Sequence, residues 1–68
     1  MNDQTVLRYA GLMGHTVALV IDDGEGGRRV TAQCDDVAWA TKLSLEYADR
    51  NPTVYKKTDK GWKAVKAV

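Results

Sequence analysis

The sequence has no phenylalanine, one proline, one cysteine and one histidine among its 68 residues. A single Cys and a single His exclude a disulfide framework and a His/Cys metal cluster within one chain. The longest apolar run, from Val17 to Ile21, is far shorter than the roughly 20 residues that a membrane span needs. The chain does not open with a basic and then apolar leader, so we expect no secretory signal, no membrane partner and a cytoplasmic location.

The composition is that of a globular protein. The formal net charge of +1 excludes strongly charged classes, such as a histone-like cation or an acidic mimic of nucleic acid. Hydrophobic residues make up 44% of the chain and charged residues 28%, a balance that indicates a packed core. With no linker, repeat or low-complexity run, we expect one compact domain over residues 1–68. Because so small a domain buries little surface on folding, a homodimer is a possible source of additional stability.

A helix is predicted over residues 35–50. Asp35 or Asp36 is the expected N-cap, and Pro52 stands just beyond the expected end. Trp39 is expected at the flank of the packed face. That face is formed by the apolar residues at helical spacing, Val37, Ala40, Leu43, Tyr47 and Ala48.

A hairpin is predicted before the helix. Its first strand, residues 15–22, is rich in β-branched side chains, with Val17, Leu19 and Ile21 on one face. A glycine- and aspartate-rich loop leads to a second strand over residues 29–34. In that strand the alternation places three side chains together, those of Val30, Ala32 and Cys34.

A second hairpin is predicted after the helix, from residues 53–57 to about 62–67. A three-residue loop that ends at Gly61 pairs Tyr55 with Val65. A two-residue loop shifts the pairing by one position and sets Tyr55 opposite Ala64. The sequence leaves both registers open.

The segment from Thr5 to Ala10 suits a strand, because glycines at positions 11 and 14 are expected to cut a helix short. The predicted fold is therefore α+β, with an antiparallel sheet of four to five strands and one helix on one face. The predicted order is β-β-β-α-β-β. The alternative, in which the first strand is a short helix, is α-β-β-α-β-β.

The sequence gives little support to catalysis. Cys34 and His15 are the candidates for a nucleophile and base, but Cys34 holds an inward strand position and His15 borders a glycine turn. Acidic residues around Gly24 do not have the spacing of a calcium loop. The glycines before Arg28 lack the Gly-Lys-Ser/Thr of a phosphate loop. We therefore predict no enzyme, no catalytic residue, no metal and no cofactor.

Charge is distributed unevenly along the chain. Residues 53–68 contain five lysines and one acid, a local charge of +4, whereas residues 1–52 contain five basic and eight acidic residues, a local charge of −3. We interpret the basic end as a surface that steers an acidic protein partner and holds it with aromatic side chains. The predicted contact residues are Tyr55, Lys56, Lys57, Lys60, Trp62 and Lys63.

Three other interpretations compete with this one. Lysines on a hairpin also protect an exposed edge strand from aggregation. The same lysines, with Tyr55 and Trp62 stacking on bases, suit a nucleic-acid-binding protein. A small subunit of a larger assembly, docked through a sheet face that no helix covers, is the third.

In size, single-domain organisation and lack of catalytic groups, the chain resembles small bacteriophage-encoded proteins that inhibit host machinery, among them anti-CRISPR proteins and polymerase inhibitors. The resemblance covers the strand–helix–strand layout of the whole chain, and no residue motif carries it. It therefore transfers no functional residue. It implies an inhibitor that occupies a surface of a host protein complex in the host cytoplasm.

Overall fold

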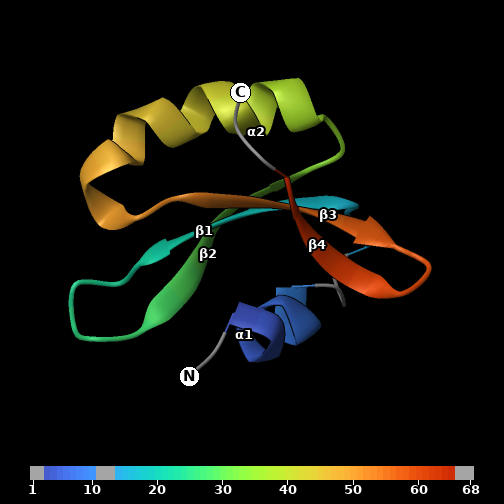
Figure 1. Ribbon diagram of the computed structural model, residues 1–68, viewed down its shortest axis with the longest axis horizontal. Coiled ribbons are helices and arrows are strands. Elements are labelled where there is room, and N and C mark those ends of the chain that lie inside the picture. Colours follow the sequence, from blue (N-terminus) through green and yellow to red (C-terminus); the bar gives the residue numbers. More distant parts are fainter. Residues whose placement is uncertain (1–2, 11–13, 66–68) are drawn as a thin grey trace.

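The computed structural model describes residues 3–10 and 14–65. In chain order these form α1 (Asp3–Ala10), β1 (Val17–Asp22), β2 (Arg28–Cys34), α2 (Val37–Ser44), the 3-10 helix η2 (Leu45–Arg50), β3 (Thr53–Thr58) and β4 (Gly61–Val65). The strands make one antiparallel sheet in the order β2-β1-β3-β4. Figure 1 shows α2 above this sheet and α1 below it. The predicted α+β class and antiparallel sheet are confirmed, with four strands where four to five were predicted.

The first element is a helix, so the predicted strand over Thr5–Ala10 is wrong. The observed order is the alternative one, α-β-β-α-β-β. The glycines at positions 11 and 14 follow α1 and do not interrupt it. Leu7 anchors the helix, because its side chain is fully buried against Ala18 and Val20 of β1. Tertiary packing thus determines the structure of a segment whose local sequence suits both states.

Both faces of β1 are buried, because β1 lies inside the sheet and a helix covers each side. Toward α2, one cluster contains Val17, Leu19, Ile21, Ala40 and Val54. Toward α1, a second cluster contains Leu7, Ala18 and Val20, with Val30, Tyr55 and Trp62 packed against it. The prediction of a helix on one face alone is therefore corrected to a helix on each face. The alternative of a small subunit in a larger assembly relied on a sheet face that no helix covers. In the structure, α1 covers that face.

A β-bulge in β2 changes which side chains share a face. Leu19 pairs with Ala32 and Val20 pairs with Val30, which leaves Thr31 as an extra residue. An extra residue reverses the alternation beyond it. Ala32 therefore packs toward α2 while Val30 packs toward α1, so the prediction that these side chains share one face is wrong. The bulge also sets Arg28 on the side of α1, where it reaches Asp3.

The helix predicted over residues 35–50 is present as α2 followed by η2. Asp36 is the N-cap, since its carboxylate accepts hydrogen bonds from the backbone N–H groups of Ala38 and Trp39. The change to 3-10 geometry rotates the later positions, and Ala48 is exposed where an inward position was predicted. The helix ends at Asn51, whose φ of 48° is left-handed.

The second hairpin has the two-residue loop. Thr58 pairs with Gly61, so Asp59 and Lys60 form the turn, and Gly61 takes a φ of +104° that favours glycine. Tyr55 therefore lies opposite Ala64. The predicted end of this strand, residues 66–67, lies outside the described residues.

Candidate functional site

The β3–β4 hairpin carries all six predicted contact residues, but it divides them between its two faces. Alternation along each strand places Tyr55, Lys57 and Trp62 on the face toward α1. Lys56 and Lys63 lie on the opposite face, and Lys60 lies in the turn. The six residues therefore do not form one continuous patch.

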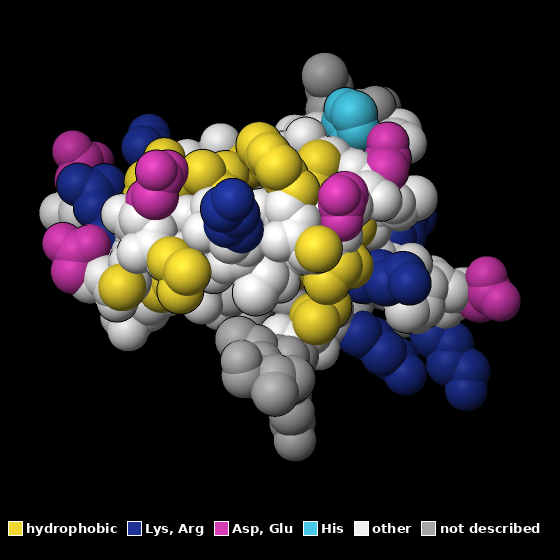
Figure 2. Space-filling view, turned by 90° about the horizontal axis from the view of Figure 1, so that it is seen from above, with side chains coloured by type: hydrophobic (Ala, Val, Ile, Leu, Met, Phe, Trp, Pro, Cys, Tyr) yellow, Lys and Arg dark blue, Asp and Glu magenta, His cyan; other side chains and the backbone are white. Residues whose placement is uncertain are grey.

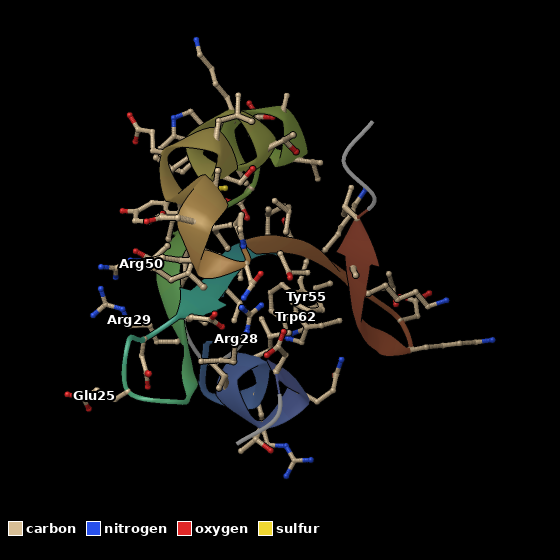
Figure 3. All side chains as sticks on the ribbon, turned by 60° about the vertical axis from the view of Figure 1, so that its left-hand side comes forward. Glu25, Arg28, Arg29, Arg50, Tyr55 and Trp62 are labelled. Carbon is tan, nitrogen blue, oxygen red and sulfur yellow. The ribbon has the colours of Figure 1, made fainter. Side chains whose placement is uncertain are left out.

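Tyr55 is part of the junction between α1 and the sheet. Its hydroxyl donates a 2.6 Å hydrogen bond to Oδ2 of Asp3, and its ring packs against the cluster around Leu7. Burial, together with this bond to a carboxylate, raises the pKa of Tyr55 to about 12. In Figure 3, Tyr55 and Trp62 lie in the space between the sheet and α1. Tyr55 therefore holds the fold together and offers a partner little free surface.

Lys56 and Lys63 lie directly opposite each other on the face away from α1. Both side chains are exposed. Like charges in directly opposed positions of an antiparallel pair repel each other. Among residues 3–10 and 14–65, no carboxylate forms an ion pair with either lysine, or with Lys57 or Lys60.

A groove lies where α1 meets the hairpin. It has a volume of about 310 Å³ and is lined by Gln4, Arg8, Lys57, Gly61 and Trp62. The side-chain amide of Gln4 donates a 3.3 Å hydrogen bond to the carbonyl oxygen of Trp62, which ties α1 to β4. Of the lining side chains that the structure describes, two are cationic and none is acidic. The groove therefore combines positive charge with an aromatic wall.

Arg8 is the residue of this groove that sequence reasoning missed. The predicted strand over Thr5–Ala10 would not bring its side chain beside that of Gln4. The signal was available, because Gln4 and Arg8 stand four positions apart and share one face of a helix. The groove thus brings two of the predicted contact residues, Lys57 and Trp62, together with Arg8 and Gln4.

Basic side chains gather at one end of the molecule. The described part of the hairpin holds four lysines and one aspartate, a local charge of +3. Seen from above in Figure 2, dark blue side chains project from the lower right of the molecule, with magenta at its tip. The opposite end carries blue and magenta side chains together. The hairpin is therefore the cationic end of the fold.

Trp39 lies on α2, away from the hairpin. It is half exposed, with a relative accessibility of 50%, and lines a separate hollow of about 230 Å³ with Lys42, Leu43 and Glu46. The expected flank position is consistent with this exposure. Of the described residues, none from β3 or β4 lines this hollow, so Trp39 stands apart from the exposed lysines of the hairpin.

Arg28 is the centre of a polar network that the sequence did not reveal. Its guanidinium donates to Asp3 through Nε at 3.0 Å and Nη2 at 3.2 Å, and to Oδ1 of Asp22 through Nη1 at 2.9 Å. It also donates to the carbonyl oxygen of Asn51 and the hydroxyl of Thr53. Figure 3 shows Arg28 pointing inward, whereas Arg29 points away from the sheet. Arg28 therefore joins α1, both hairpins and the end of η2.

The network shifts the acidity of its carboxyl groups. Burial alone raises the pKa of Asp3, but the hydrogen bonds from Arg28 and Tyr55 outweigh it, so the net pKa is lowered. Hydrogen bonds from Arg28 and Asn51 lower the pKa of Asp22. Both carboxylates are thereby held ionised around Arg28. The arrangement is that of a structural junction.

The glycine-rich loop between β1 and β2 shows no phosphate cradle. Asp23 accepts hydrogen bonds from the backbone N–H groups of Glu25 and Gly27, and these lower the pKa of its carboxyl group. A hollow of about 260 Å³ beside the loop is lined partly by Arg28, whose charge is already paired with Asp3 and Asp22. The loop is a turn closed by its own aspartate.

The two residues considered for nucleophilic chemistry lie in ordinary structural positions. Cys34 packs against the cluster under α2, and its thiol donates to the carbonyl oxygen of Asp36 at 3.4 Å. Nδ1 of His15 lies 3.5 Å from Oδ2 of Asp35. Asp35 also accepts two hydrogen bonds from Thr16, one backbone and one hydroxyl, and these lower the pKa of its carboxyl group.

Within residues 3–10 and 14–65, no cluster of three or more His, Cys, Asp or Glu side chains is placed to hold a metal ion. The same part of the chain contains no helix of the length and hydrophobicity that a membrane crossing requires. Comparison with protein families, with curated proteins and with solved structures finds no match to this chain.

Proposed function

We propose that this chain is a non-enzymatic protein-binding module that docks on an acidic surface of a partner protein through the β3–β4 hairpin. One observation carries the proposal. Four exposed lysines project from this hairpin, and within the described residues none of them forms an ion pair. Exposed cations of this kind steer association with an acidic partner and set its orientation.

Protection of an edge strand accounts for only part of this charge. Such protection places charges on a strand whose hydrogen-bonding edge is open. Lys63 lies on β4, an edge strand, but Lys56 and Lys57 lie on β3, which is paired on both sides. Lysines on an inner strand, one of them directly opposite another lysine, fit a docking surface better than edge protection.

Nucleic acid fits the same end of the molecule less well. Bases stack on aromatic rings whose faces are open, but Tyr55 and Trp62 pack against the cluster that anchors α1. The remainder of the chain carries a net negative charge, which opposes an extended polyanion. The specific form that we propose is a cytoplasmic inhibitor that acts by covering its partner, and the small single domain supports this form.

The test is capture of partners from a nuclease-treated lysate of the cells in which the protein acts, with captured proteins identified by mass spectrometry. The K56E/K63E variant should lose the captured protein. K42E changes a lysine on α2, outside the hairpin, and should retain it. Equal capture by K56E/K63E would remove the hairpin from the proposal, and capture that nuclease abolishes would replace the protein partner with nucleic acid.

A further inference from the structure

The groove between α1 and β4 has the chemistry of an anion-binding site. Arg8 approaches from α1 and Lys57 from β3, so cationic side chains stand on two sides of it. Trp62 also lines the groove, and Gly61 adds no side chain that could fill the space. Among the described residues, no acidic side chain lines the groove.

We propose that this groove binds a glutamate or aspartate side chain within an acidic segment of the partner protein. The proposal rests on the proposed function and deepens it, since it names the group that the hairpin recognises. Arg8 supplies a forked set of donors that matches a carboxylate, and Lys57 supplies a second charge. The indole of Trp62 packs against the aliphatic part of the bound side chain or against an apolar neighbour.

The size of the groove favours a peptide side chain. Its volume of about 310 Å³ is at the lower end of the range for ligand sites, roughly 300–1,000 Å³, and suits one or two side chains of a segment that continues across the surface. A nucleotide needs an open aromatic face for its base, whereas Trp62 is packed in part against the Leu7 cluster. An acidic peptide is therefore the occupant that the geometry supports.

The anchoring of α1 makes this groove a formed site. The hydrogen bond from Gln4 to the carbonyl oxygen of Trp62 joins two residues that line the groove, one on α1 and one on β4. The paired Asp3 and Arg28 hold the first turn of the same helix. Arg8 is thus presented by an element that is fixed at its N-terminal end and by buried Leu7. A site on a fixed element loses less entropy when it binds.

The hairpin offers a matched control for the test. R8Q/K57Q removes two positive charges from the groove, and K56Q/K63Q removes two from the opposite face. Both double variants have the same net charge. All four side chains are exposed, so both variants should fold, which circular dichroism checks. Any difference in binding then reports position and not total charge.

The probe is a blocked decapeptide of alternating glutamate and leucine, with a glutamine-for-glutamate version as its control. Binding is followed in ¹H–¹⁵N spectra of the W39F variant, in which Trp62 is the remaining tryptophan. We expect saturable shifts of the Trp62 indole N–H and the Gly61 amide with the glutamate peptide, and none with the glutamine peptide. R8Q/K57Q should weaken binding about tenfold or more, and K56Q/K63Q less than threefold.

Three results overturn the proposal. The first is the absence of shifts at Trp62 with millimolar glutamate peptide. The second is an equal loss of peptide binding in both double variants. That result would mean that the peptide is attracted by overall charge and not by this groove, and it would not contradict the proposed function. The third is a stronger response of the same signals to oligothymidylate, which assigns the groove to nucleic acid. Failure of the proposed function itself is distinct, because it appears as unchanged capture of the cellular partner by K56E/K63E.

Discussion

Arg28 donates two parallel hydrogen bonds to the carboxylate of Asp3, although the two residues lie 25 positions apart in the chain. The contact joins the first turn of α1 to the start of β2. A planar guanidinium holds a carboxylate in a fixed orientation through such a forked contact. The position of α1, and with it the position of Arg8 beside the groove, therefore depends on Arg28.

The R28A variant should lower the free energy of unfolding by about 2–3 kcal/mol. The substitution removes a side chain of which only 16% is exposed, and it leaves the carboxylate of Asp3 without its cation. Small domains have a total stability of about 5–15 kcal/mol, so this loss is a large share. Urea denaturation followed by circular dichroism measures it.

R29A is the matched control for R28A. Arg29 is the next residue of the same strand, but its side chain is exposed and points away from the sheet. Its removal should change the free energy of unfolding by less than about 0.5 kcal/mol. An R28K variant keeps the charge without the fork and should fall between the two. Equal losses in R28A and R29A would show that Arg28 does not anchor α1.

Alkaline pH should destabilise the fold through Tyr55. Its pKa in the folded chain is about 12, above the value of about 10 for an unfolded chain. Tyr55 therefore makes its full contribution to the free energy of unfolding below pH 10. This contribution is lost as the pH rises through 12, because the phenol of the unfolded chain releases its proton first. Absorbance at 295 nm, compared between the wild type and Y55F, should show one phenol that ionises near pH 12. A Y55F difference curve centred near pH 10 would contradict the hydrogen bond to Asp3.

The strand and helix pattern was predictable where local preference and tertiary packing agree. The β-branched run before Asp22 and the capped helix after Asp36 both formed. The structure of the α1 segment was not predictable, because its local sequence suits both a strand and a helix. The buried contact of Leu7 decides between them. The sequence did contain one indication that a second helix covers the other face of the sheet. Five consecutive apolar residues in β1 are typical of a strand buried on both faces.

The site was predictable in its charge and not in its geometry. The count of lysines after Pro52 identifies the cationic end, since charge is a sum over residues. Which lysines share a face depends on the register, and the sequence allowed two registers until Thr58 paired with Gly61. Arg8 and Arg28 reach their positions through α1 and the bulge at Thr31, which are long-range features that a local pattern does not contain.

The N-cap of α2 should contribute about 1 kcal/mol to the free energy of unfolding. The carboxylate of Asp36 satisfies the N–H groups of Ala38 and Trp39, and a D36A variant leaves them without this partner. D36N keeps an acceptor in place and should cost only a few tenths of this value. Thermal unfolding of the two variants separates capping from charge. Equal stability of D36A and the wild type would mean that packing alone sets the start of the helix.

The K63E variant should stabilise the fold while it weakens partner binding. Lys63 lies directly opposite Lys56, so the substitution exchanges a repulsion for an attraction worth about 0.2–1 kcal/mol in the free energy of unfolding. The same change removes charge from the surface that we propose docks on an acidic partner. Urea denaturation and capture from the lysate measure the two effects on one variant.

Salt provides the control for this last prediction. The gain in K63E should shrink between 0.05 M and 1 M sodium chloride, because mobile ions screen exposed charges within a few ångströms at high salt. K60E changes a turn lysine that has no directly opposed cation, so its stability should stay within about 0.5 kcal/mol of the wild type. A gain in K63E that persists in 1 M salt would assign it to side-chain packing. A K63E variant that is more stable but binds its partner more weakly would support the proposed docking role of Lys56 and Lys63, which lie directly opposite each other.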